Sequence, residues 1–320
     1  MLRKLSFISI ILIMAVSSLL VVSAQDNDSS EASRTIRPRE YAQKLPQKYI
    51  VHRPRTSKAK ESIPPAQDVK YSIENPEDST VAQGSDVGFT FWRLREAKAN
   101  DDIAVVEESR IARREKDGKV VETKVKFTPE RTQSKYEFSN GDRIRFTIES
   151  PIEGHLYLIN REQYQDGKYS DPYLIFPEKK DIGQTNKVAP GKLVFIPNET
   201  ENFILYNVSE SNKQKKAAEV FTVLISSEEI KELPPLGRDE EPRKIETAKF
   251  EQWQNEWGGK VWKFEQEGNT NLAITKVEKD ASSTKTAVLD KDDQLPQTIY
   301  HVASKSNTVI LFTVVVKIHD

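Results

Sequence analysis

The 320-residue sequence contains no cysteine, and this absence excludes several ways of building a protein. Disulfide bonds, cysteine-ligated zinc and a cysteine nucleophile are all impossible. An exported protein without disulfides depends on burial of its core for stability, which small secreted domains rarely achieve. About 235 residues follow Ser85, enough for one sizeable core. The absence also favours a bacterial envelope protein over a eukaryotic secreted one.

Histidine is scarce, and the four histidines, at positions 52, 155, 301 and 319, show no metal-ligand spacing. The sequence also lacks a G-x-S-x-G elbow, a P-loop and a G-x-G-x-x-G motif. His155 and His301 fall on predicted strands, where we expect surface or core residues. Because 30% of the residues are charged, no carboxylate pair for acid–base catalysis stands out. We therefore predict no catalytic residue, no cofactor and no metal site.

An excess of charge of one sign is missing as well. The formal net charge is −1, so no overall electrostatic field attracts nucleic acid or another highly charged partner. We predict that the protein binds no nucleic acid.

Only one long apolar run exists, from about Leu5 to Val22, and it follows the basic residues Arg3 and Lys4. Small residues at Val22-Ser23-Ala24 complete the pattern of a secretory signal peptide over residues 1–24. The run approaches the length that spans a bilayer, so an uncleaved N-terminal anchor is the alternative. No cysteine follows the run, which excludes a lipoprotein. We expect an exported protein, periplasmic or extracellular after cleavage.

Residues 25–84 are predicted to form a disordered, basic, proline-containing tether. Basic residues outnumber acidic ones between Ser33 and Ser62, and Pro38, Pro46, Pro54, Pro64 and Pro65 interrupt any regular element. Such a segment buries too little apolar surface to offset the entropy of ordering it. It serves either as a solvated spacer or as a weak electrostatic contact with anionic envelope surfaces.

The remainder, residues 85–320, is predicted to be a single, mainly β domain. Short segments with a two-residue apolar period are separated by Gly, Pro and Asn, and no alternation of strands with helices is visible. This pattern is typical of an immunoglobulin-like antiparallel β-sandwich. The predicted strands are Val87–Arg95, Val120–Phe127, Arg143–Glu149, His155–Asn160, Tyr173–Phe176, Leu193–Ile196, Phe203–Tyr206, Glu219–Ser226, Gln297–Ala303 and Val309–Ile318.

One or two short helices are expected to pack on the sandwich. Residues Thr247–Trp257 place Phe250, Trp253 and Trp257 at helical spacing before Gly258-Gly259. Thr275 and Glu278 have capping-box spacing, which indicates the start of a second helix. The densely charged segment 96–119 is predicted to be an exposed excursion with one short helix.

The stretch from Gly141 to Pro177 is the most informative part of the domain, and it is predicted to form a β-hairpin, with strands Arg143–Glu149 and His155–Asn160, followed by a loop and a third, apolar strand. Ile144, Phe146 and Ile148 share one strand face, which we expect to be buried. The opposite face carries charged and polar residues and is predicted to be solvated: Arg143, Arg145, Thr147 and Glu149.

Aromatic residues cluster around the following loop and form a candidate ligand or partner surface: Tyr157, Tyr164, Tyr169 and Tyr173. Exposed aromatics among polar groups can stack on sugars or dock a peptide. The alternative is that most of them pack the sandwich. The loop Asp166–Asp171 faintly resembles a calcium site, but a hairpin loop with glycine in the left-handed conformation explains it better.

Several motifs in the domain resemble the bacterial family called domain of unknown function 4384. They include VGFTFWRLR, FTPER, GDRIRFTIESPIEGHLYLINREQY with DPYLIFP, NKVAPGKLVFIP, AEVFTVLISS, WQNEWGG and LPQTIY. The resemblance covers about Ser85 to Asp320 and excludes the tether. It implies an exported, β-rich accessory module for sensing or binding, without assigned catalytic residues.

These observations lead to one principal functional hypothesis and two alternatives. The principal one is a non-catalytic binding or interaction module of the periplasm or cell envelope, whose partner is an envelope protein or glycan. The first alternative is a hydrolase that uses carboxylates in a loop-lined cleft. The second is a purely structural envelope component.

Overall fold

The computed structural model of the chain is built mainly from β-strands, which confirms the mainly β prediction. It describes residues 70–74, 84–102, 106–114, 120–177, 186–198, 201–233, 243–283, 287–289 and 292–319. The predicted signal peptide lies outside these residues, as does the predicted tether apart from 70–74 and Gly84. No helix in the described ranges is both long and apolar enough to cross a membrane.

The first sheet follows the order β1-β14-β15-β2-β4-β3, with β6 paired to β2 and with β10 and β11 paired to β6. All its pairs are antiparallel. Its strands are β1 (Lys70–Glu74), β2 (Ser85–Glu96), β3 (Glu107–Arg114), β4 (Val120–Thr132), β6 (Arg143–Glu149), β10 (Leu193–Ile196), β11 (Phe203–Ile204), β14 (Lys260–Glu267) and β15 (Thr298–Ala303).

The second sheet follows the order β13-β8-β7-β12-β16-β5, with β9 paired to β7. Its pairs are antiparallel except for β16 with β5, which run parallel. Its strands are β5 (Phe138–Ser139), β7 (Gly154–Tyr164), β8 (Tyr173–Phe176), β9 (Lys187–Val188), β12 (Lys216–Ser226), β13 (Arg243–Lys244) and β16 (Val309–His319).

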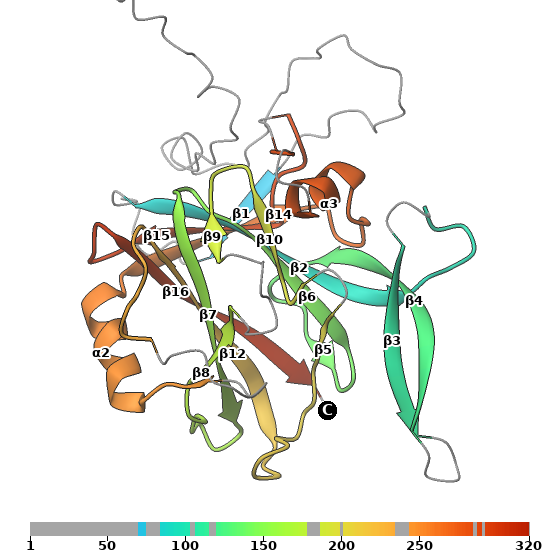
Figure 1. Cartoon of the computed structure of the whole chain (residues 1–320), viewed down its shortest axis with the longest axis horizontal. Coiled ribbons are helices and arrows are strands. Elements are labelled where there is room, and N and C mark those ends of the chain that lie inside the picture. Colours follow the sequence, from blue (N-terminus) through green and yellow to red (C-terminus); the bar gives the residue numbers. More distant parts are fainter. Residues whose placement is uncertain are drawn as a thin grey trace, which may run out of the picture. The chain divides into compact units, whose positions relative to one another are not determined.

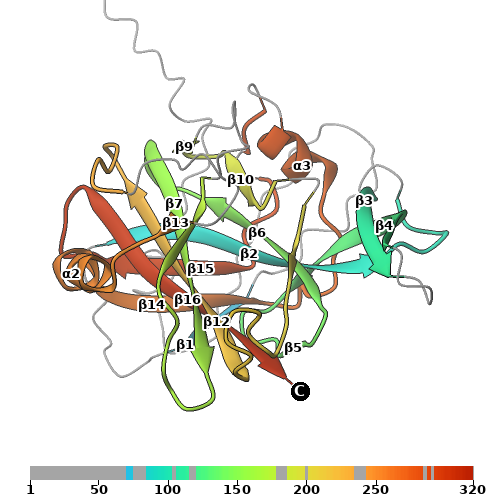
Figure 2. The same cartoon turned by 60° about the horizontal axis from the view of Figure 1, so that its bottom comes forward.

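The two sheets share one hydrophobic core, and Figures 1 and 2 show the arrangement of their strands from two directions. Ile144, Phe146 and Ile148 of β6 are fully buried, as their alternation predicts. The Phe146 ring lies at the centre, 4.8 Å from Phe221 of the second sheet and 5.4 Å from Phe91 of the first. Residues of β15 and β16 complete this core, so the C-terminal strands are an integral part of the domain.

The opposite face of β6 is also buried, and the predicted solvated face is therefore wrong. Arg145, Thr147 and Glu149 are at most 3% exposed. Glu278, Leu289, Gln294 and Pro296 lie around one small cavity with Thr147 and Glu149. Arg145 donates a hydrogen bond to the Glu201 carbonyl, and the indole N–H of Trp92 donates one of 3.0 Å to Thr147. A two-residue period identifies one buried face, but it cannot exclude a cover on the other.

Two helices occur in the described residues, where the sequence predicts them. Helix α2 (Thr247–Trp257) packs on the outer face of the second sheet through Phe250 and Trp253. Helix α3 (Lys276–Ser283) lies beside β10. It begins with the predicted capping box, since Glu278 N–H donates to Thr275 Oγ1 and Thr275 N–H donates to the Glu278 carboxylate.

The predicted hairpin of Arg143–Glu149 with His155–Asn160 does not form, because β6 and β7 lie in different sheets. Besides the two-residue strands β5, β9 and β13, three strands were not predicted. Strand β1 falls within the predicted tether but pairs with β14, so the tether prediction is wrong for these five residues. Strand β3 occupies part of the predicted excursion, where a short helix was expected, and forms a hairpin with β4. Strand β14 was not anticipated, although its sequence KVWKFEQE alternates. In each case pairing with a neighbouring strand supplies the hydrogen bonds that local sequence does not specify.

Candidate functional site

A cleft of about 870 Å³ opens where β7, β8 and β12 of the second sheet approach β11 and its flanking loop from the first sheet. We call it the tyrosine cleft. Its lining combines aromatic and polar side chains, chiefly Asn160, Glu162, Tyr164, Tyr169, Asp171, Tyr173, Asn202, Phe203, Tyr206, Asn212 and Lys216.

The alternation of β7 explains why polar groups line this cleft. Leu156 and Leu158 point into the core between the sheets. Asn160, Glu162 and Tyr164 continue the same strand face, because successive side chains alternate between the two faces. The face of β7 that fills the core therefore becomes polar at its end, and the space between the sheets opens there into the cleft.

The structure brings together three of the four tyrosines that the sequence singles out. Tyr164, Tyr169 and Tyr173 line the tyrosine cleft. Tyr157 does not, because it lies on the opposite face of β7 and is 4% exposed in the cluster beneath α2. Its hydroxyl oxygen accepts a hydrogen bond of 3.1 Å from the Ile230 N–H. Including Tyr157 in the candidate surface was therefore wrong, since its role is in packing.

We expect Tyr157→Phe to lower the free energy of unfolding by about 1 kcal/mol, because the Ile230 N–H loses its partner. Urea unfolding followed by circular dichroism measures this change. Tyr206→Phe is the matched control, since the Tyr206 hydroxyl has no hydrogen-bond partner among the described residues and the ring is 39% exposed. Equal stabilities of the two variants would contradict the packing role of Tyr157.

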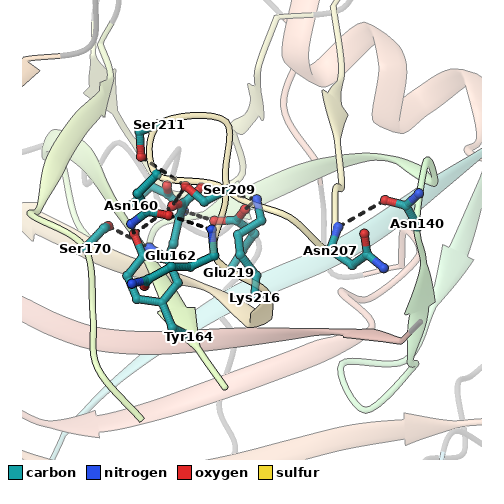
Figure 3. A network of polar contacts seen from close by, with 12 residues as sticks. Asn140, Asn160, Glu162, Tyr164, Ser170, Asn207, Ser209, Ser211, Lys216 and Glu219 are labelled. Carbon is teal, nitrogen blue, oxygen red and sulfur yellow. Dashed lines mark hydrogen bonds and ion pairs between the residues drawn. The ribbon is translucent and has the colours of Figure 1, made fainter. Parts of the chain in front are cut away.

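The floor of the cleft contains two carboxylates directly opposite each other. Glu162 of β7 and Glu219 of β12 are register partners, and like charges in this position destabilise a sheet. The ammonium of Lys216 lies between them, 2.6 Å from Glu219 Oε1 and 3.3 Å from Glu162 Oε1 (Figure 3). The lysine side chain is 6% exposed, so its single positive charge offsets one of the two negative charges from within the protein.

The remaining carboxylate oxygens are also occupied by partners from the protein. Glu162 Oε2 accepts hydrogen bonds from Tyr164 and Ser209, and Glu219 Oε2 accepts one of 3.0 Å from Asn160. Figure 3 shows these side chains gathered around the two carboxylates. Buried polar networks of this kind rigidify a site when each member is satisfied.

Burial and charge act in opposite directions on the pKa values of this network. Burial raises the pKa of Glu219 above its ordinary value, although Lys216 and Asn160 oppose the shift. Burial lowers the pKa of Lys216, but the two glutamates outweigh it and the net shift is upward. Burial and the hydrogen bond to Glu162 raise the pKa of Tyr164. The ion pairs therefore keep Lys216 charged at neutral pH.

The sequence prediction missed Lys216, Glu219, Phe203 and Tyr206 as members of the site. Lys216 precedes Glu219 by three residues, so a regular strand would place the two on opposite faces. An irregularity in the β7–β12 register between Lys216 and Ala218 brings the lysine to the cleft side. One signal was available, since polar residues replace apolar ones on the inward face of β7.

The Asp166–Asp171 loop behaves as the predicted hairpin turn. Gly167 adopts the left-handed conformation with φ of 83°, and Asp166 Oδ1 accepts a hydrogen bond of 3.0 Å from the Lys168 N–H. No group of three or more metal-ligating side chains occurs among the described residues.

Comparison of the chain with protein-family models, with curated proteins and with solved structures yields no match. The resemblance to the domain of unknown function 4384 family thus remains a prediction based on the motifs quoted above.

Proposed function

We propose that the chain is a non-catalytic binding module of the bacterial periplasm or cell envelope, and that it holds its ligand in the tyrosine cleft. The observation that carries this proposal is the convergence of Tyr164, Tyr169 and Tyr173 with polar side chains in one open cleft. Ligand sites in proteins characteristically combine aromatic walls with a few placed polar groups. An envelope protein or a glycan fits such a lining.

The state of the carboxylates supports binding over hydrolysis. A catalytic acid or base must come within about 2.6–3.2 Å of the substrate atom that gains or loses the proton. Every carboxylate oxygen of Glu162 and Glu219 is engaged by Lys216 or by hydroxyl and amide groups of the protein. A hydrolase that used this pair would first have to break the network.

The cellular localisation and the immunoglobulin-like topology are part of the same proposal. The signal-peptide pattern of residues 1–24 supports export, with the mature protein periplasmic or extracellular, or held by an uncleaved anchor. Two largely antiparallel sheets around one core are compatible with an immunoglobulin-like sandwich. Such a scaffold would present the tyrosine cleft from rigid strands.

The binding proposal predicts a partner that is captured through the cleft. The full chain, immobilised and incubated with envelope extract of the source cells, is expected to retain at least one protein or glycan. The double variant Tyr169→Ala/Tyr206→Ala is expected to lose it, because both side chains are exposed in the cleft. Tyr157→Phe is the control and should retain the same partner. Equal capture by wild type and double variant, or no capture, would contradict the proposal.

A further inference from the structure

We infer that the tyrosine cleft binds an uncharged carbohydrate, an inference that rests on the binding function proposed above. Among the aromatic side chains that the structure describes, only Tyr169 and Tyr206 are exposed by more than a third, at 45% and 39%. Both line the tyrosine cleft, although they come from different loops. The described surface thus concentrates its accessible aromatic rings at one place.

An exposed ring is a suitable surface for a sugar. The face of an aromatic ring is negative, and the C–H groups on the apolar face of a pyranose carry a small positive charge, so the two attract each other. Tyr169 is held for this contact: its hydroxyl accepts a hydrogen bond of 3.0 Å from Gln163, and the Arg161 guanidinium lies 4.8 Å from the ring centre. A ring fixed before binding loses little entropy when the ligand arrives.

The polar groups of the cleft suit hydroxyl ligands. The Asn202 carbonyl oxygen accepts a hydrogen bond of 2.9 Å from Arg143, which fixes the amide and leaves its N–H groups as donors. The hydroxyls of Tyr173 and Tyr206 have no hydrogen-bond partner among the described residues, and each can donate and accept. Sugar hydroxyls also donate and accept, so they can satisfy all of these groups.

The charges of the cleft suit a neutral ligand better than an anionic one. Its lining contains three carboxylates, Glu162, Asp171 and Glu210, and one ammonium, that of Lys216. Lys216 is already paired with Glu162 and Glu219, so it is not available to bind a phosphate, sulfate or uronate group. Lys244 is likewise paired with Asp171, and Arg161 donates to the Ser170 carbonyl while it lies over the Tyr169 ring. A neutral saccharide needs no free cation, because its affinity comes from stacking and hydrogen bonds.

Calorimetric titration of the full chain tests the inference. The probes are neutral oligosaccharides (cellohexaose, maltohexaose and chitohexaose) and one anionic polymer, polygalacturonate. We expect at least one neutral oligosaccharide to bind, with an affinity that changes less than about twofold between roughly 50 and 500 mM salt, because no ion pair is involved. Polygalacturonate should give no heat of binding.

Point variants test whether an oligosaccharide that binds does so in the tyrosine cleft. Tyr169→Ala and Tyr206→Ala should each weaken the neutral oligosaccharide about tenfold or more, which corresponds to about 1.4 kcal/mol. Val315→Ala on β16 should leave the affinity unchanged, since this exposed residue is not part of the cleft. Equal affinity of the tyrosine variants and wild type would overturn the inference.

Two outcomes separate this inference from the function on which it rests. If envelope extract supplies a protein that wild type retains and Tyr169→Ala/Tyr206→Ala loses, while every neutral oligosaccharide fails to bind, the binding function stands and the carbohydrate inference is overturned. Tighter binding of polygalacturonate than of the neutral probes also overturns it. Absence of any cleft-dependent capture or binding overturns both.

Discussion

A chain that ends at Ser226 is expected not to fold. The truncation removes β14, β15 and β16, and with them the pairing partner of β12 from Ala218 to Ser226. Seven buried side chains of the common core are lost: Tyr300, Val302, Ile310, Phe312, Val314, Val316 and Ile318. Each such side chain contributes about 1.5–3 kcal/mol. Because a domain is stable by only about 5–15 kcal/mol, the remainder cannot compensate.

Urea unfolding followed by circular dichroism tests this expectation. The truncated chain should show no cooperative transition, whereas residues 70–320, which retain every described strand, should unfold cooperatively. A soluble truncated chain with a sigmoidal transition would show that the N-terminal strands form a core without the C-terminal ones.

Replacement of Lys216 by methionine should lower the free energy of unfolding by about 3–5 kcal/mol at pH 7. Methionine fills a similar volume, but it leaves the buried carboxylate of Glu219 and the half-buried one of Glu162 opposite each other without a cation. Removal of one partner from a buried ion pair has this cost because the remaining charges are uncompensated. Urea unfolding gives the change directly.

The loss should depend on pH in a defined direction. The pKa of Glu219 is raised in the folded state, mainly by burial, so its contribution to stability is full below the ordinary value of 4.5 and is lost as pH rises through the folded pKa. Without Lys216 the pKa of Glu219 should rise further. The loss of unfolding free energy in Lys216→Met should therefore be smaller at pH 4 than at pH 7. In wild type, the pKa of Lys216 is raised above 10.5, since the glutamates outweigh burial. Its stabilising contribution should therefore disappear only above that pH.

Two further variants make the Lys216 prediction specific. Lys317→Met, an exposed lysine on neighbouring β16, should change stability by about 0.5 kcal/mol or less. The triple variant Glu162→Gln/Lys216→Met/Glu219→Gln should recover most of the lost stability, because no buried charge remains. A triple variant as unstable as Lys216→Met would show that shape, and not charge, dominates at this position.

The strand framework of the domain could be predicted from local sequence. Strand β6 and helix α2 have the predicted bounds, and the capping box of α3 forms between Thr275 and Glu278. These features depend on residues close together in the chain. Strands β1, β3 and β14 were not predicted, because their pairing with distant or weakly patterned partners decides their conformation.

Local sequence could not predict whether each face of a strand is covered by other residues or exposed to solvent. The charged face of β6 has the alternation of a solvated surface, yet residues far along the chain, such as Glu278 and Leu289, lie beside it and it is buried. Tyr157 and Tyr164 lie on the same strand and were grouped together, but their odd separation places them on opposite faces of the sheet. Their different roles follow from the cover that each face receives.

By itself, the sequence determined that this is a mainly β, cysteine-free protein whose apolar alternation needs a second sheet to cover it. Only the tertiary structure decided that Tyr169 and Tyr206 meet in one cleft and that Lys216 joins Glu162 and Glu219 at its floor. The physical reason is that strand alternation is a local property, whereas register, an irregular step in β12 and the cover on each face depend on pairing between distant segments.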